Sequence, residues 1–196
     1  MINNDQQLKS RLGSTARQQD WLTELLDWLK YILIAVLIGL LLVVFIIQRN
    51  SVIGHSMSPN LHHDDQLLVE KVSKLWGGIG YGDIVTISTR ELAGHDDGPN
   101  IIKRIIGMPG DAIRIGEEGV YRNGQLLDEP YLVPGTVTRL RSLMYEQVTL
   151  QEDEYFIMGD NREISLDSRT FGPVHKKSII GKVLLRFYPF DQFGFP

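Results

Sequence analysis

The sequence of 196 residues contains no cysteine, so disulfide bonds and thiolate-bound metal sites are excluded. It also lacks a long basic tract, and its net charge of -4 argues against nucleic acid as a main partner. After residue 50 no long stretch follows the helical period, and short β-rich runs alternate with turn residues. The 19 glycines and 8 prolines therefore predict a turn-rich, mostly β body.

One long hydrophobic run, at residues 31–47, contains no charged side chain. As a helix it would span roughly 25 Å, near the lower limit for crossing a bilayer. A buried core helix is rarely apolar on every side for this length. A cleaved signal peptide would end at a small-residue site, whereas Gln48, Arg49 and Asn50 follow here. The run therefore predicts an uncleaved transmembrane helix over residues 30–48.

Basic residues are distributed unevenly around this predicted span. Only Arg49 follows it closely, whereas four basic residues precede it: Lys9, Arg11, Arg17 and Lys30. Because Lys and Arg favour the cytoplasmic side, residues 1–29 are expected in the cytoplasm, and residues 50–196 are expected as an extracytoplasmic β domain. We therefore expect a single-pass protein of the cell membrane, with the lipid bilayer as a partner.

The β-rich part is not interrupted by regular helices, which argues against a parallel βαβ fold. The dipeptide Asn123-Gly124 lies between two β-rich runs and predicts a tight hairpin. The fold class expected is mainly β, an antiparallel structure preceded by one N-terminal transmembrane helix. Residues from about 115 to 150 could form a small subdomain.

A candidate nucleophile, Ser56, follows the predicted span in the stretch VIGHSMSPN, residues 52–60. A serine hydroxyl needs an adjacent base to act as a nucleophile, and amide donors must receive the oxyanion. Gly54 permits an unusual backbone conformation before it, and Pro59 restrains the chain after it. On this local pattern alone, an ordinary turn serine is the more frequent interpretation.

A candidate base, Lys103, lies in the stretch NIIKRIIGM, residues 100–108. Strand alternation brackets it with Ile101 and Ile105 on one face, while Arg104 points to the other. Desolvation lowers the pKa of a lysine and would let it accept a proton. Arg104 keeps its charge and should require a carboxylate partner. The alternative is an edge strand whose lysine extends to water.

Two other catalytic or metal sites are poorly supported. His62 and His63 adjoin Asp64 and Asp65, but neighbouring residues on a strand point in opposite directions, which opposes shared metal ligation. A Ser-x-x-Lys arrangement fails because Pro59 occupies the lysine position. No metal site is predicted.

A third polar block, GDNREISLDSRTFG, occupies residues 159–172. As a structural loop it could be held by carboxylate–guanidinium pairs that use Asp160, Arg162, Asp167 and Arg169. A hydroxyl from Ser165 or Ser168 could also orient the lysine amine. The two interpretations are compatible.

Taken together, these blocks resemble the type I signal peptidases, membrane-bound endopeptidases with a Ser/Lys active site. The blocks that carry the resemblance are GHSMSPNL, YGDIVTI, IIKRIIGMPGD and GDNREISLDSR, in the family's order, with VYRNGQLLDEPYL between the third and the fourth. The resemblance implies an antiparallel β catalytic core with a small β insertion.

The resemblance also implies roles for individual residues. Ser56 matches the nucleophile and, through its backbone N–H, an oxyanion donor; Lys103 matches the general base, and Ser165 matches the serine that orients it. The residues that match structural support of the site are Met57, Pro59, Arg104, Asp160, Asp167 and Arg169, with Asp160 expected to pair with Arg104.

Two positions depart from the family's pattern. Asn60 replaces the threonine that usually follows the proline. Gly54 stands where some members have a serine that contributes to the oxyanion hole, so the Ser56 N–H would carry more of that role. Glycine at this position is familiar in Gram-positive members of the family.

The function implied is removal of signal peptides from secretory preproteins through an acyl-enzyme, after small residues of the Ala-x-Ala type. Neither a metal nor an organic cofactor is expected, and the protein export machinery is a further candidate partner. Two alternatives remain: a non-hydrolytic, membrane-anchored binding domain, and a self-cleaving repressor protease with similar Ser/Lys chemistry. The predicted span and the lack of a DNA-binding helical domain oppose the second.

Overall fold

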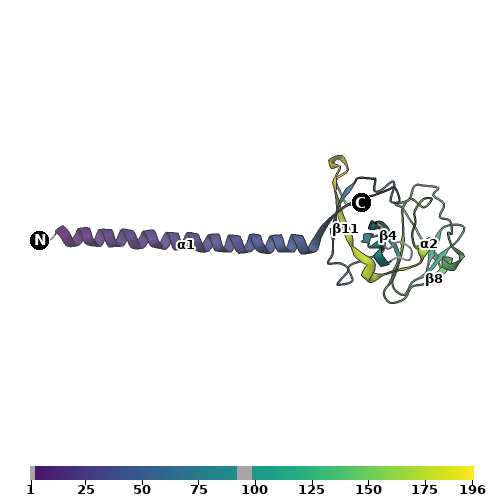
Figure 1. Ribbon diagram of the computed structural model, residues 1–196, viewed down its shortest axis with the longest axis horizontal. Coiled ribbons are helices and arrows are strands. Elements are labelled where there is room, and N and C mark those ends of the chain that lie inside the picture. The colour runs from purple at the N-terminus through teal and green to yellow at the C-terminus, as the bar shows by residue number, and fades with distance from the viewer. Residues whose placement is uncertain (1–2, 92–98) are drawn as a thin grey trace. The chain divides into compact units, whose positions relative to one another are not determined.

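The N-terminal part of the computed structural model is a single helix, α1 (Asn3–Ile46), drawn without interruption in Figure 1. The structure describes residues 3–91 and 99–196, except the side chains of 3–20 and 42–45. Within the described residues, no helix is long and apolar enough to cross a membrane. The side chains of residues 42–45 in the predicted span, and most side chains of the predicted cytoplasmic segment, lie outside the described part of the chain.

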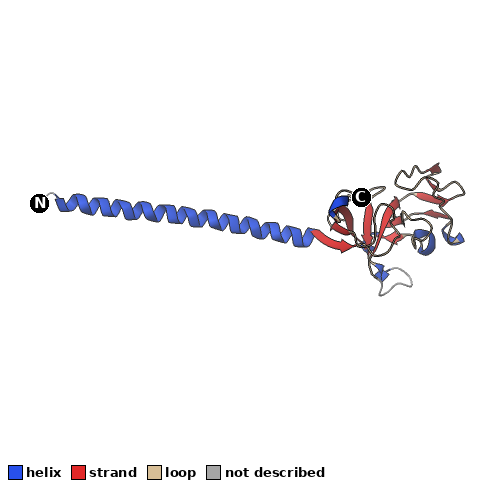
Figure 2. Cartoon of the chain, turned by 90° about the horizontal axis from the view of Figure 1, so that it is seen from above, coloured by secondary structure: helices blue, strands red, loops and turns tan. Residues whose placement is uncertain are grey.

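The chain divides into two compact units, residues 1–45 and 46–196. The second unit contains a seven-stranded sheet in the order β1-β2-β11-β3-β4-β9-β10, and every pairing within it is antiparallel. Figure 2 shows these strands. Their bounds are β1 (Ile47–Ser51), β2 (Gln66–Glu70), β3 (Ile84–Ile87), β4 (Ile101–Gly107), β9 (Glu154–Met158), β10 (Val174–His175) and β11 (Ile179–Tyr188).

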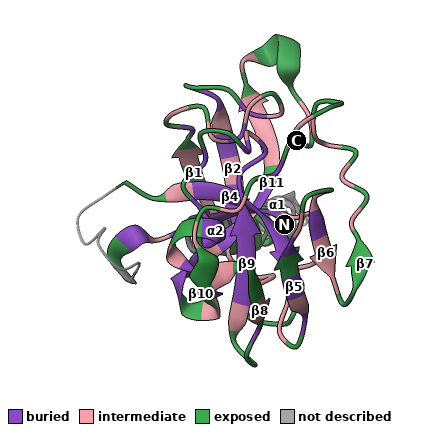
Figure 3. Cartoon of the chain, turned by 90° about the vertical axis from the view of Figure 1, so that its right-hand side faces the viewer, coloured by how far each residue is buried: buried purple, intermediate pink, exposed green. Residues whose placement is uncertain are grey.

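A second, four-stranded antiparallel sheet has the order β7-β6-β5-β8, and its strands come from residues 112–149. Its strands, grouped together in Figure 3, are β5 (Ala112–Ile115), β6 (Val120–Arg122), β7 (Gln125–Leu126) and β8 (Gln147–Thr149). Asn123 and Gly124 connect β6 to β7 with φ angles of 54° and 81°, as a tight hairpin turn requires. The predicted mainly β, antiparallel fold and its hairpin are therefore confirmed.

Short helical turns connect the strands and complete the loops near the candidate site. They are η1 (Thr89–Glu91), η2 (Leu143–Tyr145), α2 (Ser168–Phe171), η3 (Lys176–Ser178) and η4 (Phe190–Gln192).

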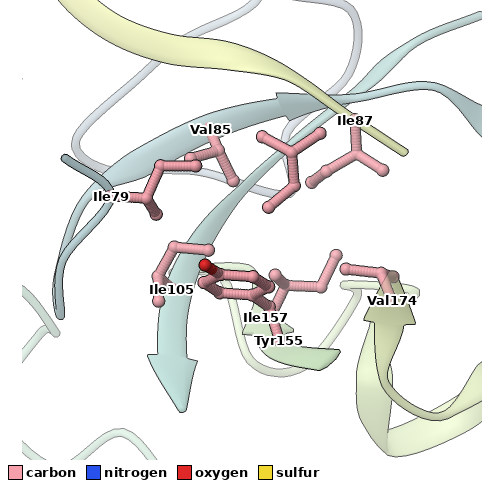
Figure 4. Packing of buried hydrophobic residues seen from close by; sticks show 8 residues of the cluster. Ile79, Val85, Ile87, Ile105, Tyr155, Ile157 and Val174 are labelled. Atoms are coloured by element: carbon pink, nitrogen blue, oxygen red, sulfur yellow. The ribbon is translucent and has the colours of Figure 1, made fainter. Parts of the chain in front are cut away.

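The apolar core joins the two sheets. One cluster packs between β3, β4 and β9 and includes Ile87, Ile105 and Ile157 (Figure 4). Another cluster combines Ile106 of β4 with residues of β5, β6 and β9. Because apolar side chains cover both faces of β4, six of its seven residues are buried. Figure 3 shows this strand in the colour of buried residues. A polar side chain on β4 is thus held rigidly and away from water.

Candidate active site

Ser56 and Lys103 meet at the surface of the seven-stranded sheet. Lys103 Nζ lies 2.7 Å from Ser56 Oγ, within hydrogen-bond distance. Ser56 belongs to the turn that follows β1, whereas Lys103 is the third residue of β4. Folding thus brings together the two residues that the sequence proposed as nucleophile and base.

Lys103 is only 3 % exposed, because β4 lies inside the sheet between β3 and β9. The edge-strand alternative, in which this lysine extends to water, is therefore wrong. Burial lowers the pKa of Lys103 from 10.5 to about 8, against the opposing attraction of the carboxylates of Asp167 and Asp160. A substantial fraction of the amine is then neutral under mildly alkaline conditions.

Arg104 points to the opposite face of β4 and pairs with Asp160. Its Nε and Nη2 donate to the two carboxylate oxygens at 2.8 and 2.6 Å, and both side chains are buried. The guanidinium also lies over the ring of Tyr131, 4.2 Å from its centroid. The charge of Arg104 is therefore compensated by the carboxylate that the sequence suggested.

Asp167 and Arg169 form a second buried pair in the loop that leads into α2. Arg169 Nη2 donates to Asp167 Oδ2 at 2.8 Å, and Asp167 also accepts the Gly159 N–H at 3.1 Å. Burial alone would raise the pKa of Asp167, but the hydrogen bonds and charge of Arg169 outweigh it and lower that pKa. Asp167 also caps α2 by accepting the Arg169 N–H.

Arg162 does not pair with a carboxylate of its own loop, as the sequence suggested, but with Glu129. Its guanidinium also donates to Thr138 Oγ1 at 2.7 Å. Glu129 lies 33 residues earlier in the chain, in the segment between β7 and β8, so this pair ties that segment to the site. Sequence reasoning missed Glu129 because an isolated acidic residue carries no local signal of a distant partner.

Ser165 is 2 % exposed and lies beside the backbone of the nucleophile turn. Its Oγ makes no hydrogen bond of good geometry within the described part of the chain, but it lies close enough to the Asp167 carboxylate to help lower the pKa of Asp167. The Ser168 hydroxyl, the other candidate, accepts the Ile157 N–H at 3.0 Å and is thereby engaged with β9. Ser165 is the serine whose hydroxyl remains available near the site.

Gly159, which sequence reasoning did not single out, permits this close packing. A Cβ atom there would lie 2.3 Å from Ser165 Oγ and 2.4 Å from the Ser56 carbonyl oxygen. Real Cβ contacts are essentially never this short, so only glycine fits. The adjoining Asn161 N–H donates to the same Ser56 carbonyl at 3.0 Å, which fixes the turn against the loop.

Met57, Pro59 and Asn60 hold the turn from its C-terminal side. Met57 is 1 % exposed and packs in an apolar cluster, and Pro59 follows it in the turn. Asn60 Nδ2 donates at 2.8 Å to both Asp160 Oδ2 and the Tyr131 carbonyl. The departure at Asn60 therefore adds a third donor to the buried ion pair.

A pocket of about 240 Å³ opens beside the nucleophile and the lysine, and its lining is mostly apolar. Its walls are formed by Ile53, Gly54, His55, Ser56, Thr89, Ile101, Lys103, Ile164, Leu166 and Phe171. Among the described residues, no group of three or more His, Asp or Glu side chains could hold a metal ion. The arrangement is suited to nucleophilic attack on a ligand that places an apolar group in this pocket.

Comparison with known proteins gives one consistent family. The family model described as signal peptidase, peptidase S26, matches residues 25–188. Signal peptidase I P of Bacillus subtilis subsp. natto is 35% identical over 176 residues, which cover 87% of this chain and 92% of that protein. Signal peptidase IB of Staphylococcus aureus strain MRSA252 is 33% identical over 185 residues, 88% and 94% of the two chains.

A crystal structure of a signal peptidase I from Enterococcus faecalis V583 is also similar, with 31% identity and a TM-score of 0.43. The match covers 54% of this chain and 96% of that chain. Because the family model and the sequence relatives each span most of the residues, the chain belongs to the signal peptidase family of S26 serine peptidases.

Proposed function

We propose that this signal peptidase cleaves secretory preproteins with a Ser56–Lys103 dyad, while α1 anchors it in the membrane. The observation that carries the proposal is the 2.7 Å contact between Ser56 Oγ and a lysine that is 3 % exposed. A charged ammonium would donate to the hydroxyl across this contact. A neutral amine accepts the hydroxyl proton instead, which is the step that generates the nucleophile.

In the proposed reaction, neutral Lys103 removes the Ser56 proton and Oγ attacks the scissile carbonyl. The leaving amine departs with a proton from Lys103, and an acyl-enzyme remains. Lys103 then activates water to release the signal peptide. The Ser56 N–H is a suitable oxyanion donor, since no acceptor within the described residues bonds to it.

Ser165 and the two buried ion pairs support this chemistry in the proposal. The buried Ser165 hydroxyl can donate toward Asp167 and still accept a hydrogen bond from Lys103, which would orient the amine. The Arg104–Asp160 pair joins β4 to the loop at residues 159–172, and the Arg169–Asp167 pair stabilises that loop internally. Met57 and Pro59 shape the nucleophile turn.

The proposed cleavage follows small residues of the Ala-x-Ala type. A pocket of about 240 Å³ with mostly apolar walls favours apolar side chains over charged ones, and the restriction to small residues is taken from the family resemblance. The same pocket contains both members of the dyad, so a small side chain bound there would present its carbonyl to Ser56.

The membrane anchor is supported by the uncharged run 31–47 and by the basic residues before it. Trp28 and Tyr31, which are 66% and 65% exposed on α1, are residue types that favour the bilayer interface. The catalytic unit would lie outside the cytoplasm, where it would meet preproteins delivered by the export machinery. The lipid bilayer is then a second partner.

The test is preprotein cleavage by the full-length chain in phospholipid vesicles. We expect Ser56→Ala and Lys103→Ala to abolish cleavage, because each removes one half of the dyad. Lys71→Ala, which alters a lysine outside the site, is the matched control and should cleave normally. Undiminished processing by both dyad variants would refute the mechanism, and no cleavage by folded wild type would favour a non-hydrolytic binding domain.

A further inference from the structure

The β1–β2 ladder continues past its last strand pair and toward the nucleophile. Beyond Ser51 and Gln66, the Val52 N–H donates to the Asp65 carbonyl at 2.9 Å, and the Asp64 N–H donates to the Val52 carbonyl at 3.0 Å. Two residues after Val52, the Gly54 N–H points to the same side of the chain. Its acceptor, at 3.1 Å, is the side-chain Nδ1 of His63 rather than a backbone carbonyl.

The backbone explains why a side chain takes this place. Asp64 has a φ angle of 70°, which turns the chain away from the ladder, and Gly54 has a φ angle of 87°. Both angles lie in the left-handed region. Gly54 is two residues before Ser56, so its bond to His63 is the last rung of the extended ladder before the nucleophile. His63 thus fixes one end of the nucleophile turn.

We propose that neutral His63 is a positioning residue for Ser56, and that its protonation releases Gly54 and slows the reaction. The proposal rests on the proposed Ser56–Lys103 mechanism. Nδ1 can accept the Gly54 N–H only when it carries no proton itself. An imidazolium has N–H donors at both nitrogens, so protonation would set two donors against each other and move the turn.

The neighbouring groups favour the tautomer of neutral His63 that carries its proton on Nε2. Asp64 Oδ1 lies 3.7 Å from His63 Nε2, which favours a proton there and leaves Nδ1 free to accept. His55 faces the ring, with the two centroids 6.0 Å apart, so a charge on His55 would oppose one on His63. His62 adjoins it in the chain, and Asp65 is turned toward Arg186 at 3.0 Å.

If His63 acts in this way, kcat/KM depends more steeply on pH than it would with the Ser56–Lys103 dyad alone. One proton on Lys103, whose pKa is about 8, lowers kcat/KM about tenfold per pH unit below that pH. A proton on His63 would add to this the loss of the Nδ1 acceptor, a further decrease of about three- to tenfold on the acid side. Activity is therefore lost faster on the acid side than a single base allows.

The experiment measures preprotein cleavage by the full-length chain in vesicles between about pH 5 and 9. His63→Ala removes the acceptor and should lower kcat/KM about three- to tenfold at alkaline pH. His63→Asn places a non-titrating oxygen near the Nδ1 position and should recover part of that loss. It should also reduce the acid limb to about tenfold per unit. His62→Asn, which alters the adjacent exposed histidine, is the matched control and should keep the steep limb.

A wild-type limb of only about tenfold per unit would overturn the proposal, as would a steep limb retained by His63→Asn. Nitrogen NMR of histidine-labelled protein gives a second readout that needs no activity. The five histidines can be assigned by substitution, and His63 should show a proton on Nε2 and an accepting Nδ1. A proton on Nδ1 of His63 would refute the proposal. If Ser56→Ala still cleaved, the dyad would fail, while the NMR result would still decide the role of His63.

Discussion

Replacing Lys103 by methionine should abolish activity yet stabilise the fold at neutral pH. Methionine fills a similar space without a charge, so the change removes the cost of burying an ammonium. The pKa of Lys103 is lowered from 10.5 to about 8. At about 1.4 kcal/mol per pKa unit, this corresponds to ~3 kcal/mol of destabilisation of the folded state when the lysine is charged. Losing the hydrogen bond to Ser56 offsets about 1 kcal/mol of that gain.

The pH dependence of this difference is the sharper part of the prediction. Because the pKa of Lys103 is lower in the folded state, the unfolded chain binds more protons between about pH 8 and 10.5, and the stability of the wild type rises with pH over that window. Lys103→Met should therefore be about 2 kcal/mol more stable than wild type at pH 7 and about equal at pH 10. Chemical unfolding followed by circular dichroism at both pH values measures this. A variant less stable than wild type at pH 7, or a difference independent of pH, would refute the reasoning.

Three further outcomes follow from the site. In preprotein cleavage assays, kcat/KM of His63→Asn should rise about tenfold per unit toward pH 8, and kcat/KM of both this variant and wild type should level off above it; a midpoint near the ordinary lysine pKa of 10.5 would exclude Lys103 as the base. Gly159→Ala should lower the cleavage rate about a hundredfold, because the new Cβ would lie 2.4 Å from the Ser56 carbonyl oxygen and push the nucleophile turn out of place. Cleavage at the wild-type rate would contradict this geometry. Asp160→Asn should cost about 3–5 kcal/mol in chemical unfolding, since the buried Arg104 loses its carboxylate, and a loss below about 1 kcal/mol would show that the pair is not needed.

The sequence predicted those features that depend on local patterns. The β-rich runs became strands, and Asn123-Gly124 became a hairpin turn because its chemistry is confined to two residues. The alternation of isoleucines around Lys103 and Arg104 predicted that these side chains point to opposite faces. What the pattern could not decide was whether β4 lies at an edge or inside the sheet, because strand order is a non-local property.

The contacts that sequence reasoning missed join positions far apart in the chain. Glu129 and Arg162 are 33 residues apart, and Asn60 and Asp160 are 100 apart. Asn60 was noticed only as a departure from a family pattern, and nothing local to it indicates a carboxylate partner. His63 was weighed as a metal ligand and set aside, although its ring contacts the backbone just before the nucleophile.

The buried arginines explain how Lys103 can be neutral beside two carboxylates. Asp160 and Asp167 both attract a proton to Lys103 and by themselves would raise its pKa. Asp160 accepts two hydrogen bonds from Arg104, and Asp167 accepts two from Arg169. Each guanidinium compensates the charge of its carboxylate and so weakens the attraction between that carboxylate and the Lys103 ammonium. Desolvation then outweighs the remaining attraction, and the pKa of Lys103 is lowered. Residues that touch neither Ser56 nor the pocket thus set the protonation state on which the proposed reaction depends.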